Sequence, residues 1–523
     1  MNTKRIMDYI LSSLPAITVF FIFTILFFLY FTIIINIQFG IDNLGMIGIY
    51  SDDEAAAVRL LMVNLNHNHL NPSGFYNYGY IYHSITFYIV KVLHYLGYEI
   101  TEQLVAYVFR FISSFAYLLS LFILYLIGVK LQISRVLMLL MMLLFASTAN
   151  LHFWAQTIHP DTLQILFIEL AILLLVMKSN VWTIMLAAVV LGVAFGVKYS
   201  SIFLLPFLGL FSLYFFGLKQ YKQWILYSVG LIVVFIGTWL LLDPYVYSNF
   251  DAFLEDFLYE SQHVAYGHGK AESTQGLLWF SLLYQELGLW QTLALLFGLS
   301  SFGIFFQKIL AKQSKELKYL LIILVLYVLA TFVYMYIAVN MRRIRYIFHI
   351  LPFVYLFAAL GYTYLIRYFK YKYFTLLFIP LTLIAGYSSI ITIKKTTHMS
   401  KKGNHNYIRA YNYIAERYSK DQFVLADYYS YKGKYFSKYK SVWGVSDKHV
   451  KTFSPDIIII NKLLSGRWYW KYDNTKFNEL KLYDNTYDGH EDYYLFAKKL
   501  FAKKTKYKVV FELEDIVILH KKD

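Results

Sequence analysis

The sequence predicts a polytopic, all-helical membrane domain followed by a small α/β domain. Of its 523 residues, 59% are hydrophobic. Apolar runs of about twenty residues, each long enough to cross a bilayer, recur from Leu14 to about Ile391. From about Lys394 the composition changes to charged and tyrosine-rich. We therefore expect a transmembrane domain over residues 1–393 and a small α/β domain over residues 394–523.

The orientation of the chain follows from its short basic turns, which favour the cytoplasm. They all fall on the cytoplasmic side if the apolar stretch Tyr80–Leu96 does not cross the membrane, and all fall outside if it does. We interpret this stretch as an interfacial or re-entrant helix in a first outer loop, residues 37–102. The N-terminus is then cytoplasmic and the C-terminal domain extracytoplasmic. The turns are Lys130/Arg135, Lys178, Lys219/Lys222, Lys308 to Lys318 and Arg367 to Lys372.

About eleven spans result from this interpretation. The first follows Lys4 and Arg5 and lacks a small-residue cleavage site, so we keep it as a span. The spans cover residues 14–36, 103–128, 136–151, 161–177, 181–197, 201–217, 224–242, 288–306, 319–339, 346–366 and 373–391.

The C-terminal domain shows one helical pattern and several strand patterns. Apolar residues at three-residue spacing predict a helix over Asn406–Tyr418, and β-branched or alternating runs predict strands. The predicted strands are Phe423–Tyr429, Asp456–Ile460, Tyr507–Leu513 and Ile516–His520.

The composition also limits which partners the protein can bind. The chain has no cysteine, so disulfides and thiolate metal sites are excluded. The formal net charge of +16 is compatible with nucleic acid. In a membrane protein it is better explained by cytoplasmic loops and anionic lipid headgroups, so we expect membrane lipids and no nucleic acid as partners.

Candidate functional residues gather on the predicted outer side. Three arginines there run against the positive-inside rule, and guanidinium groups bind phosphate oxygens in pairs, so we expect a phosphate site. The other candidates are carboxylates, histidines and one lysine. The full set is Asp52, Asp53, Glu54, His159, Asp161, Lys198, His263, Arg342, Arg343 and Arg345.

Each candidate also has a structural interpretation. The acids before Ala55 suit the first turn of a helix, Asp161 suits a helix cap, and Lys198 suits an interfacial position with its ammonium reaching water. The arginines fit an exposed cluster beside headgroups. His263 and His268 invite a metal site, although histidines in such a glycine-containing loop are more often solvated.

Taken in order, short motifs along nearly the whole chain resemble the polytopic glycosyltransferase C superfamily. The resemblance is to glycosyltransferase family 39 and the dolichyl-phosphate-mannose protein mannosyltransferase-like proteins, relatives of the lipid A aminoarabinose transferase. The sequence departs from the pattern at Ser51-Asp52, where many relatives have proline. The motifs are Asp53-Glu54, Tyr78 to Gly97, Arg110, Pro160-Asp161, Gly192 to Gly196 with Lys198, Leu205-Pro206, Arg345-Tyr346 and Leu351-Pro352.

The resemblance implies an inverting transfer of a sugar from a polyprenyl-phosphate carrier to a protein, lipid or glycan acceptor on the outer face. Asp53 would be the general base, with Asp52 as the alternative, and Glu54 would orient the acceptor or tune Asp53. Asp161, with His159 and His263, would contact acceptor or sugar. Lys198, Arg342, Arg343, Arg345 and Tyr346 would hold the phosphate. The resemblance implies no certain cofactor and leaves a divalent metal open. If a divalent metal takes part, Asp161 would be a ligand.

Two other classes remain open. A transporter or flippase of an anionic lipid-linked sugar would also use charges at membrane depth, but more often shows repeated halves. A non-catalytic envelope scaffold would use the same charges as structural ion pairs. Neither the sugar, the acceptor nor the oligomeric state follows from the residues.

Overall fold

The computed structural model describes most of the membrane domain and part of the C-terminal domain. The described residues are 37, 52–72, 78–266, 277–339, 343–369, isolated positions between 384 and 394, 406–427, 430, 439–443, 445, 447–461, 496, 499, 505–513 and 516–522. The first predicted span and nearly all of the last one lie outside them.

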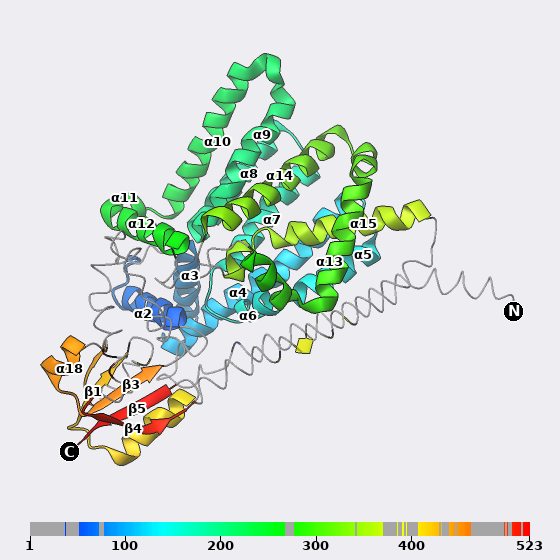
Figure 1. The fold of residues 1–523 in the computed structure, drawn as a ribbon. Coiled ribbons are helices and arrows are strands. Elements are labelled where there is room, and N and C mark those ends of the chain that lie inside the picture. The colour runs from blue at the N-terminus through cyan, green and yellow to red at the C-terminus, as the bar shows by residue number, and fades with distance from the viewer. Residues whose placement is uncertain are drawn as a thin grey trace.

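The membrane domain is a bundle of helices that run in alternating directions (Figure 1). Among the described residues, five helices are long and apolar enough to cross a membrane. The chain is therefore a multi-pass integral membrane protein, and the number of about eleven spans stays a prediction. The helices are α2 (Asp52–Asn66), α3 (Ile81–Tyr95), α4 (Glu102–Lys130), α5 (Arg135–Ala146), α6 (Ala149–Trp154), α7 (Asp161–Met177), α8 (Val181–Val197), η2 (Tyr199–Leu204), α9 (Leu205–Phe216), η3 (Leu218–Gln220), α10 (Tyr221–Leu242), α11 (Tyr245–Ser248), α12 (Phe250–Tyr266), α13 (Leu278–Lys312), α14 (Lys315–Ala338), η4 (Ile344–Ile347) and α15 (Leu351–Phe369).

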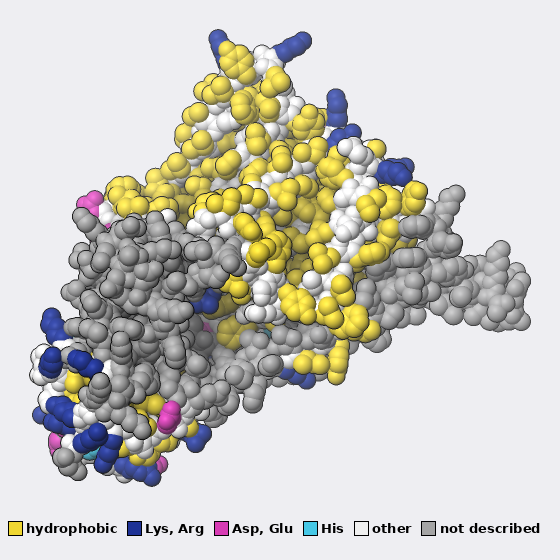
Figure 2. All heavy atoms as spheres, viewed as in Figure 1, with side chains coloured by type: hydrophobic (Ala, Val, Ile, Leu, Met, Phe, Trp, Pro, Cys, Tyr) yellow, Lys and Arg dark blue, Asp and Glu magenta, His cyan; other side chains and the backbone are white. Residues whose placement is uncertain are grey.

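Three of the five predicted basic turns meet at one end of the bundle. Arg367 donates to the carbonyl of Gln132 at 3.0 Å, and Gln313 donates to the carbonyl of Leu131 at 3.1 Å, so three predicted cytoplasmic turns touch. Figure 2 shows Lys and Arg at the helix tips far from the sheet, beyond a flank of hydrophobic side chains. A shared end for these three turns agrees with the prediction that basic turns lie on one side of the membrane. The side of the membrane that it faces stays a prediction.

Two segments differ from expectation. The predicted span 136–151 ends at Ala146, and the chain restarts as α6; the buried hydroxyl of Ser147, between the two helices, bonds to the carbonyls of Leu143 and Leu144. The predicted loop between Asp243 and Leu287 contains α11 and α12, and α13 already begins at Leu278. α13 is interrupted by a kink at Gly288, whose φ of 69° only glycine adopts readily, so its second part begins where the span 288–306 was predicted.

The C-terminal domain is a five-stranded sheet in the order β2-β1-β3-β5-β4, with a helix through residues 406–417. Strands β2 (Lys440–Trp443), β1 (Phe423–Ala426) and β3 (Ile457–Asn461) are parallel, while β5 (Ile516–Lys521) and β4 (Tyr507–Glu512) are antiparallel. The helix and all four predicted strands are confirmed. Strand β2 was not predicted, since its run is only four residues long.

Candidate active site

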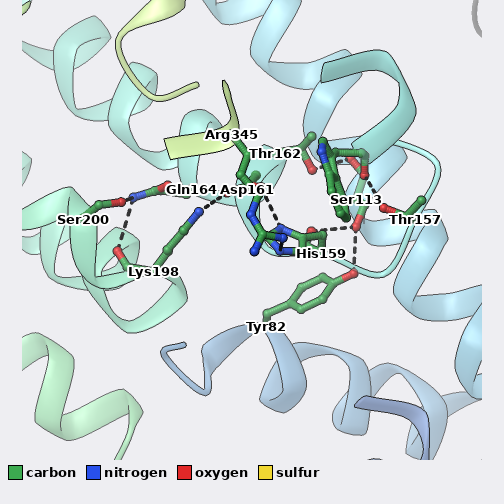
Figure 3. A network of polar contacts seen from close by, with 11 residues as sticks. Tyr82, Ser113, Thr157, His159, Asp161, Thr162, Gln164, Lys198, Ser200 and Arg345 are labelled. Carbon is green, nitrogen blue, oxygen red and sulfur yellow. Dashed lines mark hydrogen bonds and ion pairs between the residues drawn. The ribbon is translucent and has the colours of Figure 1, made fainter. Parts of the chain in front are cut away.

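The candidate site lies where the ends of several membrane helices meet (Figure 3). His159 and Asp161 come from the junction of α6 and α7, Lys198 follows the last residue of α8, and Arg345 lies on η4. Because α7 and α8 are antiparallel neighbours in the bundle, the start of one and the end of the other fall at the same depth. Predicted site residues that are far apart in sequence are thus brought together.

The four side chains form one polar chain of contacts. Lys198 Nζ pairs with Asp161 Oδ1, and His159 Nδ1 lies 2.7 Å from Asp161 Oδ2. Arg345 Nη1 lies 3.2 Å from His159 Nε2. A guanidinium can only donate, so Nε2 accepts and the proton of a neutral His159 sits on Nδ1, facing the carboxylate.

Burial dominates the electrostatics of this cluster. Asp161 and His159 are each 1% exposed, and Lys198 is 6% exposed. Burial is the main cause that lowers the pKa of His159 and of Lys198, and the nearby Asp161 carboxylate opposes it in both. His159 is therefore neutral at pH 7. Arg345 supplies positive charge in a place that water reaches poorly, and the Asp161 carboxylate favours the protonated form of Lys198 there.

Aromatic rings hold the two cations. The Arg345 guanidinium lies 5.3 Å from the ring of Trp154, and that ring lies 4.7 Å from His159. Lys198 Nζ lies 5.7 Å from the ring of Tyr346 and 5.9 Å from that of Tyr78. These are cation–π distances. Tyr346 was predicted in the site, whereas Trp154 was missed because it stands in an ordinary aromatic-rich stretch.

A glutamate from α13 sets the position of Trp154. Glu286, 5% exposed, accepts the backbone N–H of Asn150 at 2.6 Å and pairs with its side-chain amide. The carboxylate thereby satisfies an otherwise unpaired N–H in the first turn of α6. Trp154 is the last residue of that short helix. By anchoring the start of the helix, Glu286 helps to position the Trp154 ring that lies beside the Arg345 guanidinium.

A small pocket adjoins the cluster. It is lined by Ala57, Tyr78, Gly79, Tyr82, His83, Ile158, His159 and Pro160. Its wall is set by a contact between two backbones, since a Cβ on Gly79 would lie 2.0 Å from the carbonyl oxygen of Gly196. Gly196 precedes Lys198 by two residues, so this contact places the segment carrying Tyr78 against the lysine.

Tyr82 stabilises the loop that carries His159, through a hydrogen bond to Ser113. Its hydroxyl lies 2.7 Å from Ser113 Oγ, which also donates to the carbonyl of His159 at 3.1 Å (Figure 3). Thr162 Oγ1 donates to the carbonyl of Ser113 at 2.8 Å. Neither Tyr82 nor Ser113 was predicted, because a single hydroxyl on a helix carries no sequence signal.

The acidic triplet begins α2. Glu54 is fully buried and forms a two-pronged ion pair with Arg110, at 2.7 and 3.0 Å, and it also accepts the backbone N–H of Ile158 at 2.7 Å. Arg110 in turn donates to the carbonyl of Ile37 at 3.1 Å. Glu54 therefore ties α2 to α4 and to the loop that carries His159.

Several predicted residues lie beside this core or outside the described part. Position 53 is one helical turn before Ala57, which lines the pocket, while the side chains of Asp52 and Asp53 are outside the description. The same holds for the side chain of His263 on α12 and for all of Arg342. Arg343 is exposed just before η4.

A metal centre was left open by the sequence. Within the described residues, no three His, Asp or Glu side chains group as metal ligands. The Asp161 oxygens face Lys198 and His159 instead.

Asp243 joins the end of α10 to the pocket wall and gives a pH-dependent prediction. Its carboxylate is 1% exposed and accepts the backbone N–H of Tyr80 at 3.2 Å, and burial raises its pKa to about 6. An acid whose folded pKa is raised destabilises the fold progressively as pH rises above its unfolded pKa.

We expect Asp243→Asn to stabilise the protein by roughly 1–3 kcal/mol at pH about 8, and less as the pH approaches 4. Thermal unfolding in detergent across this range is the measurement. A variant that is less stable than wild type at the higher pH contradicts the argument.

Comparison with known proteins supports the fold. No family model matches the chain, and no curated protein matches it in sequence. The structure resembles that of ArnT from Cupriavidus metallidurans bound to undecaprenyl phosphate, with a TM-score of 0.50 at 11% identity, covering 85% of this chain and 88% of that one. The apo state of the same protein gives a TM-score of 0.49 at 12% identity, over 85% and 87% of the two chains. The archaeal oligosaccharyltransferase AglB from Archaeoglobus fulgidus, in complex with an inhibitory peptide and a dolichol-phosphate, gives 0.49 at 10% identity, over 79% and 66%.

The class that these observations define is a multi-pass membrane protein with a buried cationic cluster at one end of its helices. Its fold is similar to that of the ArnT structure, a membrane protein of the kind that the sequence resemblance predicted.

Proposed function

We propose that this protein is an integral-membrane glycosyltransferase that moves a sugar from a polyprenyl-phosphate carrier to an acceptor on the extracytoplasmic face. The observation that carries the proposal is the convergence of two cations, Lys198 and Arg345, beside a pocket at a helix end. Ammonium and guanidinium groups bind phosphate oxygens. The ArnT structure of the same fold has undecaprenyl phosphate bound.

In this proposal the cluster handles the leaving group. As the bond between the anomeric carbon and the phosphate oxygen breaks, negative charge grows on the lipid phosphate. Lys198 and Arg345 stabilise it, and their burial makes that interaction stronger than in water. Asp161 and His159, predicted as acceptor contacts, here act as positioning residues that hold the two cations before the donor binds. His263 stays a predicted acceptor or sugar contact.

Asp53 is proposed as the base. The acceptor hydroxyl or amine attacks the anomeric carbon as its proton passes to the Asp53 carboxylate, and the phosphate leaves from the opposite side, which inverts the configuration. Support comes from the backbone of α2, since residues i and i+4 share a helix face and Ala57 lines the pocket. Glu54 is proposed to fix α2 through Arg110.

A reconstituted assay tests the proposed class against the transporter alternative. Purified protein in detergent, given a radiolabelled polyprenyl-phosphate sugar and envelope extract, should form a labelled product. A transporter forms none, because detergent solution has no compartments to separate. Comparative mass spectrometry of envelope glycans, in a deletion strain with and without the wild-type gene, should then identify the sugar that is lost.

Lys198 should be needed for donor binding. We expect Lys198→Met to weaken binding of undecaprenyl phosphate by roughly 10- to 100-fold, the effect of losing one charged hydrogen bond. Binding is measured by native mass spectrometry of the purified protein. Lys178→Met, which removes an exposed lysine at the other helix end, should bind like wild type.

A second variant separates binding from folding. Lys198→Met leaves Asp161 buried beside a neutral side chain, so Lys198→Met combined with Asp161→Asn should melt closer to wild type while binding stays weak. Normal binding by this double variant would remove Lys198 from the phosphate site.

A further inference from the structure

The positive charge of the chain is concentrated in the C-terminal domain. Residues 394–523 hold 26 Lys and Arg against 15 Asp and Glu, a formal net charge of +11 out of +16 for the whole chain. The expectation that cytoplasmic loops carry this charge therefore accounts for only the smaller part. Charge bias orients short loops, whereas long domains cross the membrane largely regardless of charge. Orientation thus gives no reason for the basic tail.

The described residues place part of this charge in one cluster. Lys506 Nζ and Lys521 Nζ both reach the hydroxyl oxygen of Ser454, at 3.3 and 3.1 Å, and Lys522 Nζ reaches the carbonyl of Thr505 at 3.2 Å. Sheet pairing forces this arrangement, since Tyr507 of β4 faces Lys521 of β5. We name Lys506, Lys521 and Lys522 the lysine cluster.

Nothing acidic in the described residues neutralises the lysine cluster. The ion pairs found there involve other basic residues: Arg110, His159, Lys198 and Arg417. Lys506 and Lys522 are exposed, and Lys521 is half-buried. Two ammonium groups that share one hydroxyl repel each other, and a bound anion would remove that repulsion.

The lysine cluster faces away from the membrane domain. It lies at the amino end of β3 and the carboxyl end of β5, beside the C-terminus, which Figure 1 shows at the far side of the sheet from the helices. Figure 2 shows Lys and Arg side chains over this part of the domain. Headgroups of the membrane that holds the helices are therefore on the wrong side to neutralise it.

We propose that the lysine cluster is a docking surface for a linear, phosphate-bearing polymer of the cell envelope. The partner is a flexible polyanion with repeated charges, because the ammonium groups lie at two places on the surface, two at Ser454 and one at Thr505, which matches phosphates spaced along a chain better than one deep anion pocket. This surface acts independently of sugar transfer, so its test does not depend on the proposed activity.

Binding of labelled inorganic polyphosphate tests the proposal. Full-length protein is held in nanodiscs of phosphatidylcholine, and affinity is measured by fluorescence anisotropy over a range of salt. The variant is Lys506→Gln, Lys521→Gln and Lys522→Gln together. With three phosphate contacts removed, we expect the slope of log affinity against log salt to shrink by about 2 and affinity at low salt to fall at least about tenfold.

The matched control removes the same charge elsewhere. Lys178→Gln, Lys219→Gln and Lys222→Gln together neutralise three exposed lysines at the opposite end of the molecule and should bind like wild type. Equal loss in both variants, or no binding by wild type, overturns the proposal. Binding of the nanodiscs to phosphatidylglycerol vesicles but not to polyphosphate also overturns it, since the partner would then be a lipid surface. Unchanged thermal unfolding shows that the variants are folded.

Discussion

Asp53→Asn should abolish sugar transfer while leaving the protein folded. The asparagine keeps the size of the side chain but cannot accept the proton of the acceptor, and loss of a general base typically costs about 10²- to 10⁴-fold in rate. The measurement is the initial rate of transfer from a polyprenyl-phosphate sugar by purified protein. In cells, the variant should fail to restore the missing envelope sugar in a deletion strain at normal protein level.

Asp52→Asn is the matched control, since it removes the same charge from the adjacent residue of α2. We expect it to keep most of the activity. If Asp52→Asn abolishes transfer and Asp53→Asn does not, the base is Asp52. If both variants are active, the carboxylates of Asp52 and Asp53 are not catalytic and the proposed base is wrong.

Removal of Glu54 should destabilise the protein more than it should alter the chemistry directly. Glu54→Ala leaves the Arg110 guanidinium, only 2% exposed, without its carboxylate. Breaking a buried ion pair from one side typically costs about 3–5 kcal/mol. We expect a clear fall in the unfolding temperature in detergent, with transfer falling as well because α2 loses its connection to α4.

A double variant tests whether this pair acts as a unit. Glu54→Leu and Arg110→Met together should be more stable than either single variant, because no buried charge is left alone. Glu54→Gln tests the other explanation, that Glu54 contacts the acceptor. If it lowers transfer without any change in unfolding temperature, Glu54 contacts the acceptor, as the sequence resemblance implied, and its role is not mainly to anchor α2.

The sequence predicted the helices and strands well because their signals are local. Runs of about twenty apolar residues and β-branched segments such as Ile457–Ile460 report on burial directly. A long apolar run does not reveal where a helix is interrupted, because a helix that ends inside the bundle needs no polar residue next to its end in the sequence. The restart at α6 depends on Glu286 of α13, which is distant in sequence.

The site was predicted in part for a similar reason. Charged residues stand out in an apolar chain, so Asp161, Lys198 and Arg345 were found, and their convergence follows from the direction of the helices. The residues that hold them were not found. Trp154 is one ring among many in a chain with 20% aromatic residues, and the partnership of Glu54 with Arg110 requires the fold.

The contact between Gly79 and Gly196 has a consequence for how variation can enter this protein. One glycine belongs to the half that would receive the acceptor, and the other to the half that would hold the donor. Their main chains touch with no side chain between them, so the spacing of the two halves does not depend on any particular pair of side chains. Neighbouring positions are then free to change with a new sugar or acceptor, whereas a methyl group on Gly79 would meet the main chain of Gly196 and push the two segments apart.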